Sequence, residues 1–267
     1  MCSTSVDEIG HRLCKLRDEL KTDHLNSEEI CEECSDVFYL RGDKLTFTTA
    51  AEHAIPAPAI DPQRWINTKP YRIHEVHREE FQRKTDQMLR DRIIQPSTSS
   101  WNSPVLLIPK KADALGKNKR RTVVDFRKPN EVTVDGSFPL TVISEILDTF
   151  GKSKYFFTKD GASGFLQVPM KPEEQATIAF SNMEGHFQYN RTPFGFKGAP
   201  ATFQRSKTTV LSGIQRTKCL VYLDDVVLGE NLRTHNETLR EVFVRMRQHN
   251  LKLQPDKCEI YEGKFLI

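Results

Sequence analysis

The stretch Thr217–Glu230, TKCLVYLDDVVLGE, decides how the rest of this 267-residue chain is interpreted. Two adjacent carboxylates, Asp224 and Asp225, interrupt an otherwise apolar run of strand-forming residues. Cys219–Leu223 and Val226–Leu228 are therefore predicted to form the two short strands of a hairpin with the acids at its tip. Ionised carboxylates between apolar walls are costly unless a cation lies between them, and a divalent metal meets that requirement. The alternative is that the Asp-Asp pair simply makes the turn.

A second acidic position favours the metal interpretation. In Tyr155–Phe165, YFFTKDGASGF, an aromatic strand runs directly into Asp160. Gly161 and Gly164 then remove side chains from the backbone that follows, which indicates the close approach of a ligand or of another chain segment. Asp160 and Asp224 lie 64 positions apart, so the fold has to bring them together.

Composition describes a globular chain that can bury one sizeable core or two small ones, because 37% of its residues are hydrophobic. No apolar run approaches the roughly 18 residues of a membrane span, and the N-terminus MCSTSVDEIG lacks the pattern of a signal peptide. We therefore expect no membrane partner and an intracellular location. The net charge of +3 does not by itself argue for nucleic-acid binding.

The distribution of charge is more informative than the net charge. The stretch from Lys110 to Lys128 contains eight basic residues and only two acidic residues. Such a cluster suits nucleic-acid or phosphate binding, but taken alone it is also explained as a hairpin whose basic side chains are simply solvated. The basic residues are Lys110, Lys111, Lys117, Lys119, Arg120, Arg121, Arg127 and Lys128.

The six cysteines are expected to be reduced thiols, because no secretory signal accompanies them. Cys31 and Cys34 have the spacing of metal ligands, but no second pair completes a tetrahedral zinc site. We interpret the pair as incidental.

Several motifs occur in one order along the chain, and together they closely resemble the reverse transcriptase of gypsy-type long-terminal-repeat retrotransposons. The resemblance extends from about Asn67 to the C-terminus. The motifs are Trp101-Asn102-Ser103-Pro104, Val124-Asp125-Phe126-Arg127, Asp160 followed by Ala162-Ser163-Gly164-Phe165, Pro193-Phe194-Gly195 with Ala199–Arg205, and Tyr222-Leu223-Asp224-Asp225.

The resemblance implies an α+β fold with the palm and fingers of a right-hand polymerase, preceded by an N-terminal helical and extended segment. Residues 1–66 are similar to the connector between the protease and the polymerase of a polyprotein, and 67–267 to the reverse transcriptase domain. Fingers are expected at about 67–135 and 168–198, and palm at about 136–167 and 199–267. The chain ends where the family continues into thumb and RNase H, which would come from the rest of the polyprotein.

Hydrophobic periodicity and breaker residues predict the individual elements. Helices are expected at Val6–Leu20, from a start at Asn26–Glu29, at Glu75–Arg92 with Pro96 as its stop, within 129–150, at Pro200–Gly213 and at Asn236–His249. Strands are expected within Trp101–Lys111, Lys119–Arg127, 166–170, 177–181 and 185–190.

The resemblance also assigns roles to individual residues. It implies that Asp160, Asp224 and Asp225 are the catalytic acids and metal ligands of a two-metal site. Oxygen ligands suit two Mg²⁺ ions, with Mn²⁺ as the alternative.

Further residues are implied to bind the substrates, a deoxynucleoside triphosphate (dNTP) and a primer on an RNA or DNA template. Phe165 is expected to lie under the sugar and exclude a 2′ hydroxyl. Lys110 and Arg121 would contact the triphosphate, Gly161 and Ala162 would border the nucleotide, Phe194 and Gly195 would border the template and nucleotide pocket, and Tyr222 and Leu223 would lie near the primer terminus.

The predicted function is that of a retrotransposon RNA-directed DNA polymerase, a nucleotidyltransferase. The alternative is an inactive, truncated remnant that retains at most weak nucleic-acid binding. Two further rivals are a two-metal nuclease, which the basic hairpin and Phe165 disfavour, and an RNA-building palm polymerase, which Phe165 also opposes. Some positions depart from the family pattern and bear on activity: Gly161, Leu166, Gly198, Ser206 and Lys207.

Overall fold

The structure of the chain is a computed structural model that describes residues 21–22, 25–40, 42–55, 65–72, 75–109, 120–134, 155–159, 161–215, 218–220, 225–229 and 231–262. Two compact units are present. Unit 1 comprises Met1–Ala51, Phe138–Gln167 and Phe203–Ile267, and unit 2 comprises Glu52–Ser137 and Val168–Thr202. The helices predicted at Val6–Leu20 and within 129–150 fall wholly or largely outside the described residues.

Unit 1 is built on a five-stranded sheet in the order β1-β10-β5-β9-β8. All its neighbours pair antiparallel except β1 and β10, which are parallel. The predicted hairpin is confirmed over the described residues, because Cys219 on β8 pairs with Val227 on β9. The strands are β1 (Lys21–Thr22), β5 (Tyr155–Lys159), β8 (Cys219–Leu220), β9 (Asp225–Gly229) and β10 (Glu259–Glu262).

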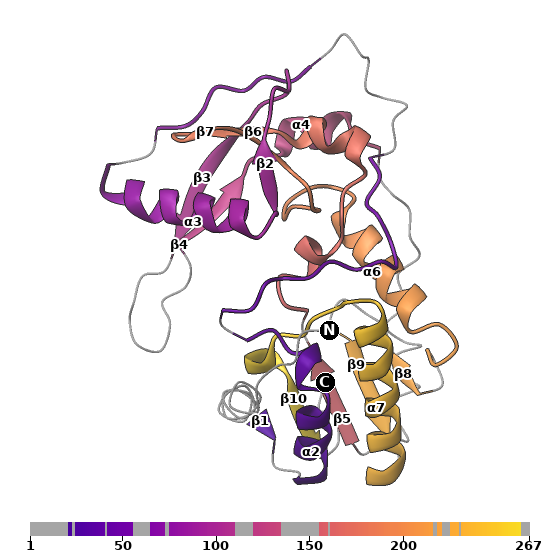
Figure 1. The fold of residues 1–267 in the computed structure, drawn as a ribbon. Helices are drawn as coiled ribbons and strands as arrows, with labels where there is room; N and C mark the ends of the chain where they lie inside the picture. Colours follow the sequence, from indigo (N-terminus) through magenta and orange to yellow (C-terminus); the bar gives the residue numbers. More distant parts are fainter. Residues whose placement is uncertain are drawn as a thin grey trace, which may run out of the picture. The chain divides into compact units, whose positions relative to one another are not determined.

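Helices α2 (Leu25–Glu33) and α7 (Leu232–Gln248) lie side by side over this sheet (Figure 1). Their contact encloses the unit 1 core, in which Phe243 packs edge-to-face on both Phe157 and Phe38. The predicted start of α2 within 26–29 is confirmed to within one residue.

Helix α7 begins at Leu232, four residues before the predicted start. The cause is a capping box: the Asn231 side chain accepts a hydrogen bond from the Thr234 N–H at 3.0 Å, and the Thr234 hydroxyl accepts from the Asn231 N–H. At the other end, Asn250 adopts a left-handed backbone with φ of 56°, which asparagine tolerates. The predicted end near Asn250 is therefore confirmed.

The N-terminal residues belong to this core. Ile30 on α2, Val37 on the short 3₁₀ helix η1 (Ser35–Val37) and Phe38 are each at most 1% exposed. The backbone N–H of Leu253 donates to Val37 O at 2.9 Å, and the N–H of Tyr39 donates to Leu253 O at 2.8 Å. The connector role of residues 1–66 stays a prediction, but part of that segment is built into unit 1.

Unit 2 holds a second five-stranded sheet in the order β2-β7-β6-β3-β4. The predicted pair of basic strands is confirmed, because β3 and β4 are antiparallel with Val105 opposite Val124. The strands are β2 (Ile94–Pro96), β3 (Ser103–Pro109), β4 (Arg120–Val124), β6 (Phe180–Asn182) and β7 (Gly185–Tyr189). Two helices accompany them, α3 (Arg78–Arg90), preceded by η2 (Glu75–His77), and α4 (Arg127–Val132).

Three predicted elements differ in unit 2 and at its border. Helix α3 ends at Arg90, because Arg92 turns into the left-handed region with φ of 52°, and Pro96 instead closes β2. The strand expected at 166–170 is wrong: Gly164–Gln167 form the 3₁₀ helix η3. The strand expected from 177 begins at Phe180, because Pro172 opens the 3₁₀ helix η4 (Pro172–Ile178).

Helix α6 (Ala199–Val210) opens at the predicted Ala199-Pro200, where proline is tolerated in the first turn. It ends three residues before the predicted Gly213, which takes a φ of 85° in the turn that follows.

Candidate active site

The end of β5 and the start of β9 are hydrogen-bonded neighbours in the unit 1 sheet. Lys159 pairs with Asp225, and Thr158 pairs with Val226. In the sequence, Asp160 follows Lys159 and Asp224 precedes Asp225, although Asp160 and Asp224 lie outside the described residues. The sheet therefore brings together the two described strand ends that adjoin the predicted catalytic acids.

The turn after β5 is fixed by its backbone. Gly161 forms an antiparallel bridge with Leu253, and the Ala162 N–H donates to Lys252 O at 3.0 Å. Ala162 is 1% exposed, and Ser163 takes a left-handed backbone with φ of 50°. The segment that carries the predicted nucleotide contacts is thus a tightly held turn.

The Gln167 side chain closes this turn. It is fully buried, its amide nitrogen donates to Ala162 O at 2.8 Å and to Lys252 O at 2.9 Å, and its amide oxygen accepts from Lys252 N at 2.7 Å. A buried amide with three backbone partners replaces the bonds that a regular strand would make. Gln167 belongs to none of the sequence motifs, and its only signal was that it is a polar residue inside an apolar run.

The proposed sugar-facing residue, Phe165, packs edge-to-face on Phe203 of α6, with ring centroids 5.5 Å apart and an interplanar angle of 86°. Glycine at position 164 makes room for this contact, because a Cβ there would lie 2.6 Å from the far end of the Phe203 ring. A Cβ on Gly161 would lie 3.3 Å from the same ring, so the departure from the family pattern at Gly161 also accommodates Phe203.

Two other departures lie on α6. The Lys207 ammonium sits 4.5 Å from the Phe203 ring centroid in a cation–π contact, and the residue is 5% exposed. Ser206 is fully buried, and its hydroxyl has no hydrogen-bond partner among the described residues. These two departures from the family pattern therefore place buried polar side chains on α6.

In unit 2, Phe194 is 49% exposed beside Gly195, which has a φ of 83°. Asn130 of α4 holds this turn, because its side chain donates to Gly195 O and accepts from Lys197 N, both at 2.9 Å. Asn130 belongs to none of the sequence motifs. About half of the aromatic side chain is accessible, while the turn that presents it is fixed.

A polar cluster lies next to this helix. Arg127 binds Asp125 through two nitrogens at 2.8 and 2.6 Å, and the Tyr71 hydroxyl donates to Asp125 at 3.1 Å. The Arg127 guanidinium, aided by Tyr71, lowers the pKa of Asp125 to about 2. Asp125 is thus an anion at neutral pH.

The remaining predicted contacts fall in segments whose side chains lie outside the described part of the chain. Arg121 lies on β4 opposite Ile108, and only its backbone is described. Lys110, Tyr222 and Leu223 lie outside the described residues.

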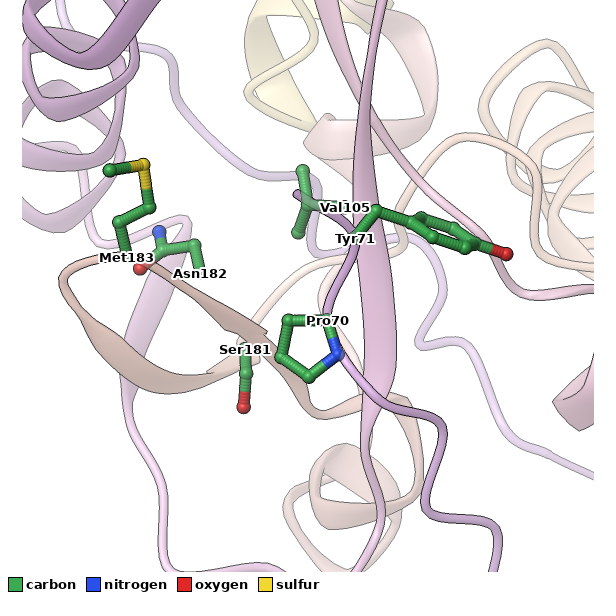
Figure 2. Close-up of a pocket in the computed structure, with 6 residues that line it drawn as sticks. All are labelled: Pro70, Tyr71, Val105, Ser181, Asn182 and Met183. Carbon is green, nitrogen blue, oxygen red and sulfur yellow. The ribbon is translucent and has the colours of Figure 1, made fainter. Parts of the chain in front are cut away.

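A small pocket in unit 2 does not match a nucleotide site. Figure 2 shows Met183 and Asn182 on one side of it and the Tyr71 ring directed away from them. Its volume of about 90 Å³ is well below the roughly 300 Å³ of small-molecule sites. The lining residues are Pro70, Tyr71, Val105, Ser181, Asn182 and Met183.

The described residues hold neither a ready-made metal cluster nor a membrane helix. Among them, no group of three or more His, Cys, Asp or Glu residues is arranged to hold a metal ion. Cys31 and Cys34 are buried, and burial raises the pKa of the Cys34 thiol, which opposes the thiolate form that ligands need. No helix in this part of the chain is long and apolar enough to cross a membrane.

The fold and the paired strand ends define a polymerase-type α+β palm and fingers. Residues 108–267 match the model of the reverse transcriptase (RNA-dependent DNA polymerase) family, and the chain belongs to this family. Reverse transcriptases generally use divalent metal ions.

Known polyproteins contain similar sequences. The chain is 39% identical over 257 residues to the retrovirus-related Pol polyprotein from transposon 297 of Drosophila melanogaster, covering 93% of this chain and 24% of that polyprotein. It is 36% identical over 236 residues to the polyprotein from transposon 412 of the same organism, covering 88% and 19%. The enzymatic polyprotein of cauliflower mosaic virus (strain NY8153) is 31% identical over 205 residues, covering 76% and 30%. The chain therefore spans less than a third of the length of these relatives.

Solved structures confirm the fold. The foamy viral protease-reverse transcriptase in complex with RNA/DNA hybrid matches 100% of this chain and 36% of its own, with a TM-score of 0.80 and 20% identity. Its dRH form in complex with double-stranded DNA matches 97% and 45%, with a TM-score of 0.79 and 21% identity.

Proposed function

We propose that this chain carries the nucleotidyl-transfer centre of a retrotransposon RNA-directed DNA polymerase. It would join a dNTP to the 3′ hydroxyl of a primer on an RNA or DNA template. The observation that carries the proposal is the pairing of Lys159 with Asp225, because this register aligns the strand ends that adjoin Asp160 and Asp224. Family membership supports the same chemistry.

The acidic residues fit a divalent metal. Asp160, Asp224 and Asp225 would supply carboxylate oxygens, the ligands that Mg²⁺ and Mn²⁺ prefer. When bound, two such ions would lower the pKa of the primer 3′ hydroxyl and neutralise the charge of the leaving pyrophosphate. The pairing of β5 with β9 would hold these acids close together, so that little reorganisation would be needed when substrate binds.

The other residues would orient the nucleotide. Phe165, held against Phe203, would lie under the sugar and exclude a 2′ hydroxyl. Gly161 and Ala162 would present backbone to the nucleotide without obstructing it. Lys110 and Arg121 would neutralise the triphosphate, for which ammonium and guanidinium donors are suited.

Nucleic acid would contact both units. Unit 1 would act as palm, with Tyr222 and Leu223 at the primer terminus, and unit 2 as fingers. In unit 2, the exposed ring of Phe194 beside Gly195 offers a stacking surface for a template base or the incoming base. The foamy viral enzyme is seen with RNA/DNA hybrid and with double-stranded DNA, which supports a primer–template partner.

Primer extension tests this proposal. The purified 267-residue chain is given a labelled DNA primer on an RNA template, the four dNTPs and Mg²⁺ or Mn²⁺. We expect extension that is abolished in Asp224→Asn and strongly reduced when ribonucleotides replace dNTPs. Val244→Ala, at a half-exposed position of α7, serves as an unaffected control.

Circular dichroism establishes that each variant is folded. A folded wild-type chain that extends no primer with either metal would contradict the proposal and favour the inactive remnant. Extension that persists in Asp224→Asn would show that another site, or a contaminant, performs the reaction.

A further inference from the structure

Three segments that are far apart in the sequence meet at Gln167. Its side chain binds Ala162 in the turn after β5 and Lys252 in the segment after α7. Its own backbone carbonyl accepts a hydrogen bond from the Thr48 N–H at 2.7 Å. Gln167 is 0% exposed and Thr48 is 1% exposed, so water does not substitute for these bonds.

The N-terminal segment also bonds to the residues on both sides of Lys252. The Thr46 hydroxyl donates to Asn250 O at 2.6 Å. The backbone bonds of Leu253 to Val37 and Tyr39 extend the same arrangement. Residues 250–253 are therefore held between the N-terminal segment and the turn after β5.

We propose that Gln167 is a positioning residue for nucleotidyl transfer, which fixes the turn Gly161–Phe165 to the backbone of Lys252. Bonds from Val37, Tyr39, Thr46 and Thr48 complete this arrangement. This inference rests on the proposed function. Gln167 has no direct role in the chemistry: it acts through the turn that begins next to Asp160 and ends at Phe165.

Gln167 can position the turn because its amide and the turn bond to the same backbone carbonyl, that of Lys252. The Ala162 N–H bonds to Lys252 O, the carbonyl that Gln167 also contacts. Removing the amide takes a buried hydrogen-bond partner away from both Lys252 N–H and Ala162 O. Relaxation of the turn would displace Phe165, and misplacement of reacting groups by about 1 Å can reduce rates by about 100-fold.

The test compares Gln167→Met with Val242→Ala. Methionine has nearly the length of glutamine but lacks the amide, while Val242 is a fully buried α7 residue of the unit 1 core that makes none of these bonds. Single-nucleotide incorporation gives kcat and KM for a dNTP and for the matching ribonucleotide. We expect Gln167→Met to lower kcat/KM for the dNTP by about tenfold or more. The ratio of kcat/KM for the dNTP to kcat/KM for the ribonucleotide should fall by a similar factor.

Loss of folded protein alone does not give this result. It would lower the active fraction, and therefore kcat, equally for both nucleotides, and Val242→Ala is expected to behave in that way. An unchanged preference in Gln167→Met, or an equal change in Val242→Ala, overturns the inference.

Hydrogen exchange tests the role of Gln167 independently of activity. On the same proteins, we expect peptides that contain 161–167 to exchange at least about tenfold faster in Gln167→Met than in Val242→Ala, since exchange reports local opening. Equal exchange in the two variants would refute the positioning role even if the wild type is active. An inactive wild type with the expected exchange difference would count against the proposed function. It would still show that Gln167 stabilises the turn.

Discussion

Replacing Gly164 by alanine tests whether Phe203 supports Phe165, because the added methyl group would collide with the Phe203 ring. The Cβ would lie 2.6 Å from Cζ and 2.9 Å from Cε1. Ordinary contact begins at 3.4 Å, so the ring tip has to move by about 0.8 Å. The ring is confined by Phe165 on one side and the Lys207 ammonium on another, and it therefore has to displace one of them.

The expected cost is that of overpacking, about 1–3 kcal/mol, or a decrease in Tm of about 2–8 °C for a chain of this size. A displaced Phe165 should also exclude a 2′ hydroxyl less well. We expect the preference for a dNTP over its ribonucleotide to fall by about tenfold, which corresponds to about 1.4 kcal/mol of lost discrimination.

Gly213→Ala is the matched control. Gly213 has a φ of 85°, and no described atom lies within 4 Å of the place that an added methyl group would take, so alanine there costs about 1–2 kcal/mol through the backbone alone. Thermal unfolding and single-nucleotide incorporation are measured on both variants. The reasoning fails if Gly164→Ala is as stable as the wild type, or if both variants change nucleotide preference equally.

Three other substitutions have defined outcomes. Ser206→Ala should raise the free energy of unfolding by about 1 kcal/mol in a denaturant titration, because it removes a buried hydroxyl without a partner among the described residues; a loss of stability would show that the hydroxyl is satisfied. Asn231→Ala should lower it by about 1 kcal/mol through loss of the capping box, and an unchanged melting curve by circular dichroism would contradict this. The pKa of Asp125 is depressed to about 2, so its contribution to the free energy of unfolding is present above about pH 4 and is lost as the pH falls toward 2. Asp125→Asn should therefore lose less stability between about pH 5 and pH 2.5 than the wild type does. Parallel losses in the two proteins would refute the depressed pKa of Asp125.

Local sequence was sufficient wherever periodicity and breakers agree. The apolar runs on either side of Asp224 and Asp225 indicated β8 and β9, and the aromatic run before Asp160 indicated β5. Family resemblance supplied the relation between these strands, which the register of Lys159 with Asp225 then supports. The metal ligands themselves remain a proposal.

Long-range bonds explain where sequence reasoning failed. Residues 166–170 alternate like a strand, yet the Gln167 amide binds Ala162 and Lys252, and η3 forms instead. The early start of α7 depended on a capping pair with threonine in place of the usual Glu or Gln. Asn130 gave no local signal, because its partners lie 65 and 67 residues away.

The N-terminal segment shows why motifs alone underestimate the folding unit. The family match begins at residue 108, yet Val37, Phe38 and Thr48 are buried in unit 1. Val37 and Thr48 also bond to Leu253 and Gln167, in the segments that hold the turn after β5. Motifs mark residues that face substrate, whereas these residues face the core and the segments behind the turn. If Gln167 positions that turn, then the geometry of the proposed site depends on residues more than 100 positions before Asp160, in a stretch where the motifs give no indication of function.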